Sequence, residues 1–192
     1  MSEYKKYQRV AVLVDAQNIF YSVRHVFRNA RMNYKKLIER AVSGRQLIRA
    51  IAYVVETPEV DQTEFREMLV REGYEIKIKA VKVRSDGSMK ADWDMGIAID
   101  AISMAEKIDV MVLVSGDGDF VDMVNLLKSR GVVVEALSVK ASTSEDLIKA
   151  VNFYGAIEEA DLITSNRRPP HRAGGHRRRG PQKAETDAIN PI

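Results

Sequence analysis

The stretch RVAVLVD (residues 9–15) decides the fold, because an unbroken run of Val, Ala and Leu separates one basic residue from one acidic residue. A continuous apolar run of this kind is typical of a strand that is buried on both faces of a parallel sheet. After Asp15 a helical pattern covers residues 17–29, with apolar residues at near-helical spacing: Ile19, Phe20, Val23, Val26 and Phe27. The opening of the chain therefore predicts a strand followed by a helix, the repeating unit of α/β folds.

The same alternation continues along most of the chain. Further strands are predicted at 46–55, 75–83, 110–114 and 132–137, and further helices at 33–43, 59–72, 92–107, 120–130 and 144–151. Such alternation predicts an α/β, Rossmann-like three-layer sandwich with a mainly parallel central sheet. We expect the strand order 3-2-1-4-5, counted along the chain from residues 9–15. The strand at 75–83 alternates apolar and basic residues, which indicates a sheet edge where a homodimer could form.

The composition narrows the class of protein. The chain has 192 residues, of which 45% are apolar, and this is enough for one sizeable core. It contains no cysteine, which excludes disulfides and thiolate metal sites and favours a reducing, cytoplasmic compartment. The first ten residues, MSEYKKYQRV, lack the apolar run of a signal peptide, and no stretch approaches the roughly 20 apolar residues of a membrane span. We therefore expect a cytoplasmic protein that does not enter a membrane.

Charge is spread unevenly over the chain. Residues 165–192 hold seven basic and two acidic residues, a net charge of +5, so the remainder carries −2 of the total of +3. This tail, which includes Arg177, Arg178 and Arg179, has almost nothing to bury, and we expect it to be disordered. A basic segment on a mildly acidic body indicates contact with a polyanion such as RNA. The other interpretation is a solvated tail that only aids solubility.

Acidic residues end two of the predicted strands. Asp15 ends the first strand, and Asp117 follows the fourth within VLVSGDGDF (112–120), with Asp119 two residues later. In the expected strand order these two strands are neighbours at the point where the order reverses, so the acids would meet there. Asp94, in the first turn of the helix at 92–107, could add another carboxylate. Crowded carboxylates need a cation, and oxygen donors without cysteine suit Mg²⁺ or Mn²⁺ better than zinc.

Simpler interpretations of the same residues stay open. SGDGDF alone is also typical of a tight turn in which Asp caps the following helix, and the two glycines would allow close approach of backbone or substrate. Lys90 and Arg84, in the loop before the helix at 92–107, could hold substrate phosphates or simply be solvated. Asp100 shares the apolar stripe of that helix, which favours a structural role. Neither a P-loop nor a dinucleotide-binding glycine motif is present in the sequence.

Three stretches resemble the NYN branch of the PIN-like ribonucleases: VLVDAQNIF (12–20), KADWDMGIAIDA (90–101) and LVSGDGDFVDMVNLLKSRGVVVEAL (113–137). The resemblance spans residues 9–163. It implies a Rossmann-like fold with an acidic, Mg²⁺-binding pocket that cleaves RNA. By position it implies that the acidic residues are Asp15, Asp94, Asp117 and Asp119, with Asn18 as a polar partner beside Asp15. The family's usual glycine after Lys90 is Ala91 in this chain.

These observations lead to one main hypothesis and two others. Residues 1–164 are predicted to be an NYN nuclease domain that acts as a metal-dependent endoribonuclease on single-stranded RNA, with residues 165–192 as a basic tail. The alternative is a catalytically weak RNA-binding or regulatory module of the same fold. A phosphohydrolase acting on small phosphorylated molecules is more distant, because no D-x-D-x-T pattern follows the first strand.

Overall fold

A computed structural model describes residues 6–28, 30–57, 60–83, 89–90 and 92–163. Its centre is a six-stranded sheet in the order β4-β3-β1-β7-β8-β9, in which every neighbouring pair is parallel. The strands are β1 (Arg9–Asp15), β3 (Gln46–Glu56), β4 (Glu75–Ala80), β7 (Val110–Val114), β8 (Val133–Ser138) and β9 (Phe153–Ala156). The first five of these are the predicted strands in the predicted order 3-2-1-4-5, and β9 adds a sixth at the edge.

The path of the chain through this sheet brings two strand ends together. The chain starts in the centre with β1, moves outward through β3 to β4, and returns to β7 on the other side of β1. Val14 of β1 pairs with Val114 of β7, so the residues that follow these strands leave the sheet side by side. Parallel α/β sheets place their ligand sites at such a reversal of strand order, beyond the carboxyl ends of the strands.

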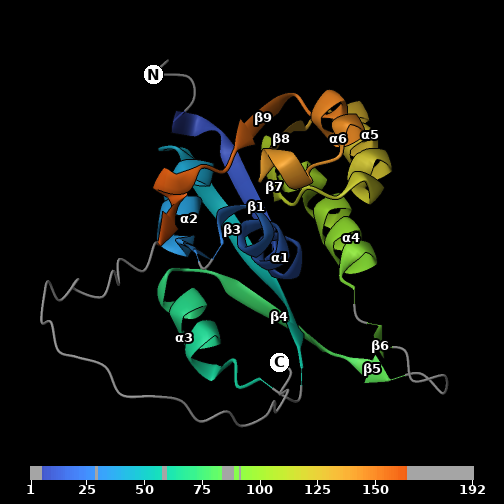
Figure 1. Ribbon diagram of the computed structural model, residues 1–192. Helices are drawn as coiled ribbons and strands as arrows, with labels where there is room; N and C mark the ends of the chain where they lie inside the picture. The colour runs from blue at the N-terminus through green and yellow to red at the C-terminus, as the bar shows by residue number, and fades with distance from the viewer. Residues whose placement is uncertain (1–5, 29, 58–59, 84–88, 91, 164–192) are drawn as a thin grey trace, which may run out of the picture.

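Helices cover both faces of the sheet and make a three-layer sandwich (Figure 1). They are α1 (Ala16–Phe27), α2 (Tyr34–Val42), α3 (Thr63–Arg71), α4 (Asp94–Met104), α5 (Val121–Ser129) and α6 (Glu145–Ala150). Alternate residues of β1 face opposite sides, as the two-residue period of a strand requires. Val12 and Val14 pack in the core formed with α1, α2 and α3, whereas Ala11 and Leu13 pack in the core formed with α4, α5 and α6.

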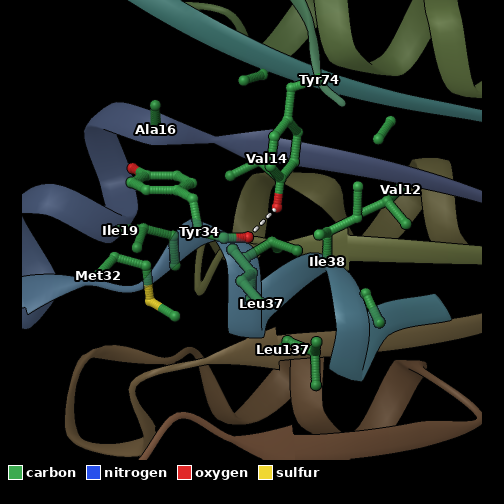
Figure 2. Close-up of a cluster of buried hydrophobic side chains, with 14 of the residues drawn as sticks. Val12, Val14, Ala16, Ile19, Met32, Tyr34, Leu37, Ile38, Tyr74 and Leu137 are labelled. Atoms are coloured by element: carbon green, nitrogen blue, oxygen red, sulfur yellow. Dashed lines mark hydrogen bonds between the residues drawn. The ribbon is translucent and has the colours of Figure 1, made fainter. Parts of the chain in front are cut away.

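Two tyrosines tie α2 to the segment between α3 and β4. The hydroxyl of Tyr74 donates to the backbone oxygen of Tyr34 at 2.9 Å, and the two rings lie nearly perpendicular with their centroids 6.1 Å apart (Figure 2). The ring of Tyr34 points toward Ala16 at the start of α1, in the same apolar cluster as Ile19 and Met32 (Figure 2). Both tyrosine side chains are buried, so their packing fixes the first turn of α1 against α2.

Short elements complete the described part of the chain. β2 (Arg31–Met32) pairs with β10 (Leu162–Ile163), and β5 (Lys82–Val83) pairs with β6 (Met89–Lys90), both antiparallel. Single 3₁₀ turns are η2 (Ala105–Lys107), η3 (Gly118–Phe120), η4 (Lys140–Ser142) and η5 (Glu159–Asp161). Within the described residues, no helix combines the length and apolar character that crossing a membrane requires.

The apolar residues of α1 do not all face the core. The near-helical spacing in the sequence includes Phe20 and Val26, but they are 49% and 36% exposed, whereas Ile19 and Val23 are buried. The reason is geometric, because each helical residue is rotated by about 100° from the last, so Phe20 points away from the face that Ile19 and Val23 share. The exposed side of α1 therefore carries a large aromatic ring.

Candidate metal centre

Three carboxylates meet at the carboxyl edge of the sheet. One oxygen each from Asp94, Asp117 and Asp119 lies within 4.8 Å of the others. Asp94 is the first residue of α4, and the other two lie in the loop between β7 and α5. Asp94 and Asp117 are half-buried, whereas Asp119 is exposed, so the cluster opens to solvent on the side of Asp119. The prediction that these acids converge at the end of β7 agrees with this geometry.

Asp15 is the buried member of the same region. It is the N-cap of α1, and its Oδ1 accepts a hydrogen bond from the backbone N–H of Asn18 at 3.0 Å. Burial and, to a smaller extent, the negative charges of Asp94 and Asp117 raise the pKa of Asp15 to about 6, against the opposing effect of the Asn18 N–H. The carboxylate of Asp15 thus lies within electrostatic reach of two members of the cluster.

Asn18 joins α1 to the loop that carries two of the acids. Its side-chain oxygen accepts a hydrogen bond from the backbone N–H of Gly116 at 3.0 Å. In the same loop, Oδ1 of Asp117 accepts from the backbone N–H of Asp119 at 3.0 Å, and the hydroxyl of Ser115 accepts from the N–H of Asp117. The interpretation of SGDGDF as a capping turn is therefore correct, and the turn is also what presents the carboxylates of Asp117 and Asp119 to each other.

Another segment of the chain approaches both glycines of this loop closely. A Cβ atom on Gly116 would lie 2.6 Å from the backbone oxygen of Ser142, and one on Gly118 would lie 2.8 Å from the hydroxyl oxygen of Ser144. The backbone N–H of Ser144 donates to the oxygen of Gly116 at 2.9 Å. Close approach of backbone or substrate to these glycines was expected, and the part of the chain that approaches them is the segment that follows β8. The sequence indicated Ser144 only as the start of the helix at 144–151, and its side chain makes no capping hydrogen bond.

A polar network holds α4 against the sheet. The carboxylate of Asp100 accepts hydrogen bonds from the hydroxyl of Tyr53 at 2.6 Å and from the ammonium group of Lys77 at 2.7 and 2.8 Å. Although burial raises the pKa of Asp100, the hydrogen bonds from Lys77 and Tyr53 outweigh it and lower that pKa. The indole N–H of Trp93, the N-cap of α4, donates to the backbone oxygen of Val54. Asp100 is thus structural, and the network fixes where α4 begins.

The sequence that forms this site matches a known family. A family model described as NYN domain fits residues 9–158. The chain belongs to the NYN domain family. The match covers the whole six-stranded sheet and all four acids at its carboxyl edge.

Two relatives of this NYN domain show how far the likeness extends. The low amplitude and bright protein LabA of Synechococcus elongatus is 28% identical over 155 residues, which are 76% of this chain and 82% of LabA. The crystal structure of VPA0982 from Vibrio parahaemolyticus, a protein of unknown function, superposes with a TM-score of 0.77 at 34% identity. That likeness covers 85% of this chain and 99% of VPA0982. The fold is therefore shared with a solved structure over nearly the full length of that structure.

The donor set of the NYN domain fits a hard divalent cation. Asp94, Asp117 and Asp119 offer only carboxylate oxygens, the ligands that Mg²⁺ and Mn²⁺ prefer. Helix N-termini give partial compensation, since Asp15 caps α1, Asp94 opens α4 and Asp117 caps the turn that leads into α5. Even so, the pKa of Asp15 stays raised, first by burial and then by the negative charges of Asp94 and Asp117.

The predicted phosphate-binding residues fall largely outside the described residues. Arg84 and the tail residues 177–179 are among those that the structure does not describe. Lys90 belongs to β6, which pairs with β5, but its side chain also lies outside the described part. Their predicted contacts with RNA therefore stay predictions, as does the disorder of the tail.

Proposed function

We propose that this NYN domain is a metal-dependent endoribonuclease that hydrolyses phosphodiester bonds of single-stranded RNA. The main support for this proposal is one observation. One oxygen from each of three carboxylates, which come from two separate segments, lies within 4.8 Å of the others at the reversal of strand order. Asp15 adds a fourth acid from the end of the neighbouring strand. Membership of the NYN family supports a nucleic-acid substrate.

The four acids have distinct positions in this proposal. Asp15, Asp94, Asp117 and Asp119 would hold Mg²⁺ or Mn²⁺. A divalent ion held there supplies Lewis-acid activation of the phosphodiester and of the attacking water. Asp119 is the exposed member, so an incoming strand would meet the site on its side, while buried Asp15 lies at the base of the site.

The rest of the chain preorganises these acids and binds the substrate. Asn18 holds the β7–α5 loop through the N–H of Gly116, so the positions of Asp117 and Asp119 are set before any ligand arrives. Lys90 and Arg84 are proposed to contact substrate phosphates, and Arg177, Arg178 and Arg179 to attract the strand through its backbone charge. A cytoplasmic location, suggested by the cysteine-free composition, is part of the same proposal.

The test is turnover of short single-stranded RNA by the full chain, with Mg²⁺, with Mn²⁺ and with EDTA. Loss of a residue that merely supports a metal ligand costs about 10–100-fold in activity, so Asp117→Asn and Asp119→Asn should each cost at least about 100-fold. Asp122→Asn is the matched control, because Asp122 is an exposed acid only three residues from Asp119 and is expected to keep wild-type activity. Binding of Mn²⁺ followed by electron paramagnetic resonance should weaken in the first two variants only.

Two outcomes would count against the nuclease. Equal turnover by the wild type and Asp117→Asn, or turnover unaffected by EDTA, would remove the basis of the proposal. RNA binding without turnover, lost when residues 165–192 are deleted, would favour a catalytically weak RNA-binding or regulatory module instead. A homodimer through the β4 edge belongs to either alternative and is tested separately by sedimentation of the purified chain, since β4 is an edge strand as predicted.

A further inference from the structure

An exposed aromatic pair lies on α1. Phe20 and Tyr21 are 49% and 61% exposed, and their ring centroids lie 5.3 Å apart in an edge-to-face arrangement. The guanidinium carbon of Arg24 is 5.8 Å from the centroid of the Phe20 ring. The core side of the helix is occupied by Ile19 and Val23, so neither ring is needed to fix α1 on the sheet. Two large rings and a guanidinium group thus form one continuous surface that the core does not use, the α1 platform.

The α1 platform lies next to the acidic cluster. α1 begins directly after its N-cap Asp15, and a helix rises 1.5 Å per residue, so the Cα atoms of Phe20 and Tyr21 lie only about 7.5 and 9 Å along the axis from that of Asp15. Residues three apart on a helix are neighbours on its surface, which places Tyr21 beside Asn18. The side chain of Asn18 in turn contacts Gly116 in the loop that carries Asp117 and Asp119. The platform is therefore within reach of a nucleotide adjacent to a phosphate held at the cluster.

The charge of the segment that contains the α1 platform suits an anionic polymer. Residues 16–38 contain no Asp or Glu, and their five Lys and Arg residues are all exposed: Arg24, Arg28, Arg31, Lys35 and Lys36. Of these, Lys36 already donates to the backbone oxygen of Ala160. This basic stretch borders a carboxylate cluster that would repel a phosphate backbone on its own. An apolar protein partner would not need such a charge, whereas a phosphodiester strand would be attracted by it.

We propose that Phe20 and Tyr21, together with Arg24, form a stacking site for unpaired bases of a single-stranded RNA bound at the acidic cluster. The site rests on the proposed function, because the cluster defines where the strand runs. Aromatic faces and guanidinium planes stack on any base, which gives affinity without strong sequence preference. Bases within a duplex are already stacked on each other, so the site selects single strands.

The test measures binding and needs no turnover. The full chain is titrated, in EDTA, into a fluorescein-labelled single-stranded RNA, and affinity is read by fluorescence anisotropy. Phe20→Ala and Tyr21→Ala should each weaken binding about tenfold, as expected for the loss of one stacked base. Tyr21→Trp should keep wild-type affinity, because it preserves an aromatic face. Phe153→Ala is the matched control, since Phe153 is 63% exposed on β9 and is expected to leave binding unchanged.

A second ligand isolates the contribution of the bases. An oligonucleotide of the same length with abasic sugars should bind wild type, Phe20→Ala and Tyr21→Ala equally, because only phosphates remain to be recognised. Equal affinity of the wild type and both alanine variants for the normal RNA would overturn the proposal. So would an equal loss of affinity for the abasic strand in the alanine variants. Circular dichroism of each variant confirms that its fold is retained.

These outcomes separate the stacking site from the nuclease. Base-dependent binding through the α1 platform in a chain that cleaves no RNA would support the stacking site and refute the catalytic role. Cleavage that depends on Asp117, together with unchanged RNA affinity of Phe20→Ala and Tyr21→Ala, would support the catalytic role and refute the stacking site. The salt dependence adds a third readout, because Arg24→Gln should reduce the slope of affinity against salt, whereas Tyr21→Ala should not.

Discussion

Replacing Asp15 by Asn should make the metal-free protein more stable at neutral pH. Asp15 is 8% exposed, and burial raises its pKa from an ordinary value of 3.8 to about 6. A carboxyl group with a raised pKa stabilises the folded chain fully only below pH 3.8, and this contribution is lost as the pH rises through about 6. The difference between the two values corresponds to about 3 kcal/mol at neutral pH. Asn cannot ionise, and its side-chain oxygen can still accept the N–H of Asn18.

The expected result has both a size and a pH dependence. In EDTA at pH 7.5, Asp15→Asn should be more stable than the wild type by up to about 3 kcal/mol, or roughly 6–12 °C in Tm for a domain of this size. The advantage should shrink between pH 6 and pH 4, because the wild-type carboxyl group becomes protonated in that range. Thermal and urea denaturation across pH 4–7.5 measure it, and Asp122→Asn serves as the control for loss of an exposed acid nearby.

Two results would refute this reasoning. An Asp15→Asn variant that is equally or less stable at pH 7.5 would mean that ionised Asp15 costs no folding free energy. A stability difference that does not change with pH would mean that the effect of Asn comes from packing rather than from charge. Addition of Mg²⁺ is a second test of the free-energy cost of ionised Asp15. A cation bound at the acids should stabilise the wild type more than Asp15→Asn.

Three other predictions test the loop, the core and the cation site. Gly116→Ala should destabilise the protein by about 1–3 kcal/mol in urea denaturation, because its Cβ would lie 2.6 Å from the backbone oxygen of Ser142; an unchanged midpoint would contradict that contact. Arg45→Met should cost about 3 kcal/mol or more in the same assay, since it leaves Glu135 without its bidentate ion pair at 2.7 and 2.9 Å; the double variant with Glu135→Gln should recover part of the loss. Mg²⁺ should raise the Tm of the wild type but raise that of Asp119→Asn much less; equal shifts would place the ion elsewhere.

The sheet could be predicted because its central strands are buried on both faces. Strands such as β1 and β7 appear in the sequence as continuous apolar runs, and the intervening helical patterns require parallel connections. Strand β9 was missed for the opposite reason. It has four residues, FYGA, at the edge of the sheet, with Phe153 exposed, and no periodic pattern can form over so short a segment.

The acidic cluster was predictable for topological reasons, whereas its supporting contacts were not. Parallel strands share one carboxyl edge, so the strand order alone predicts that acids at the ends of β1 and β7 lie on the same side of the sheet. The hydrogen bond from Gly116 to Asn18 and the approach of Ser142 to the same glycine join segments that are far apart in sequence. No local pattern encodes such contacts, although the position of residues 142–144 just after a neighbouring strand was a usable signal.

The separation of charge on this molecule constrains the order in which ligands can bind. The acids at the carboxyl edge repel a negatively charged phosphodiester. Asp94 and Asp117 already help to raise the pKa of Asp15, which means that they disfavour one more negative charge beside them. The adjacent stretch 16–38 carries only basic charge and exposes two aromatic rings. In our proposal, a strand therefore contacts the α1 platform before the cluster is neutralised, and its phosphate approaches Asp119 closely only after a cation has bound. In the proposed nuclease, RNA affinity should consequently rise with Mg²⁺ in the wild type, and this gain should be lost in Asp119→Asn while stacking on Phe20 and Tyr21 persists.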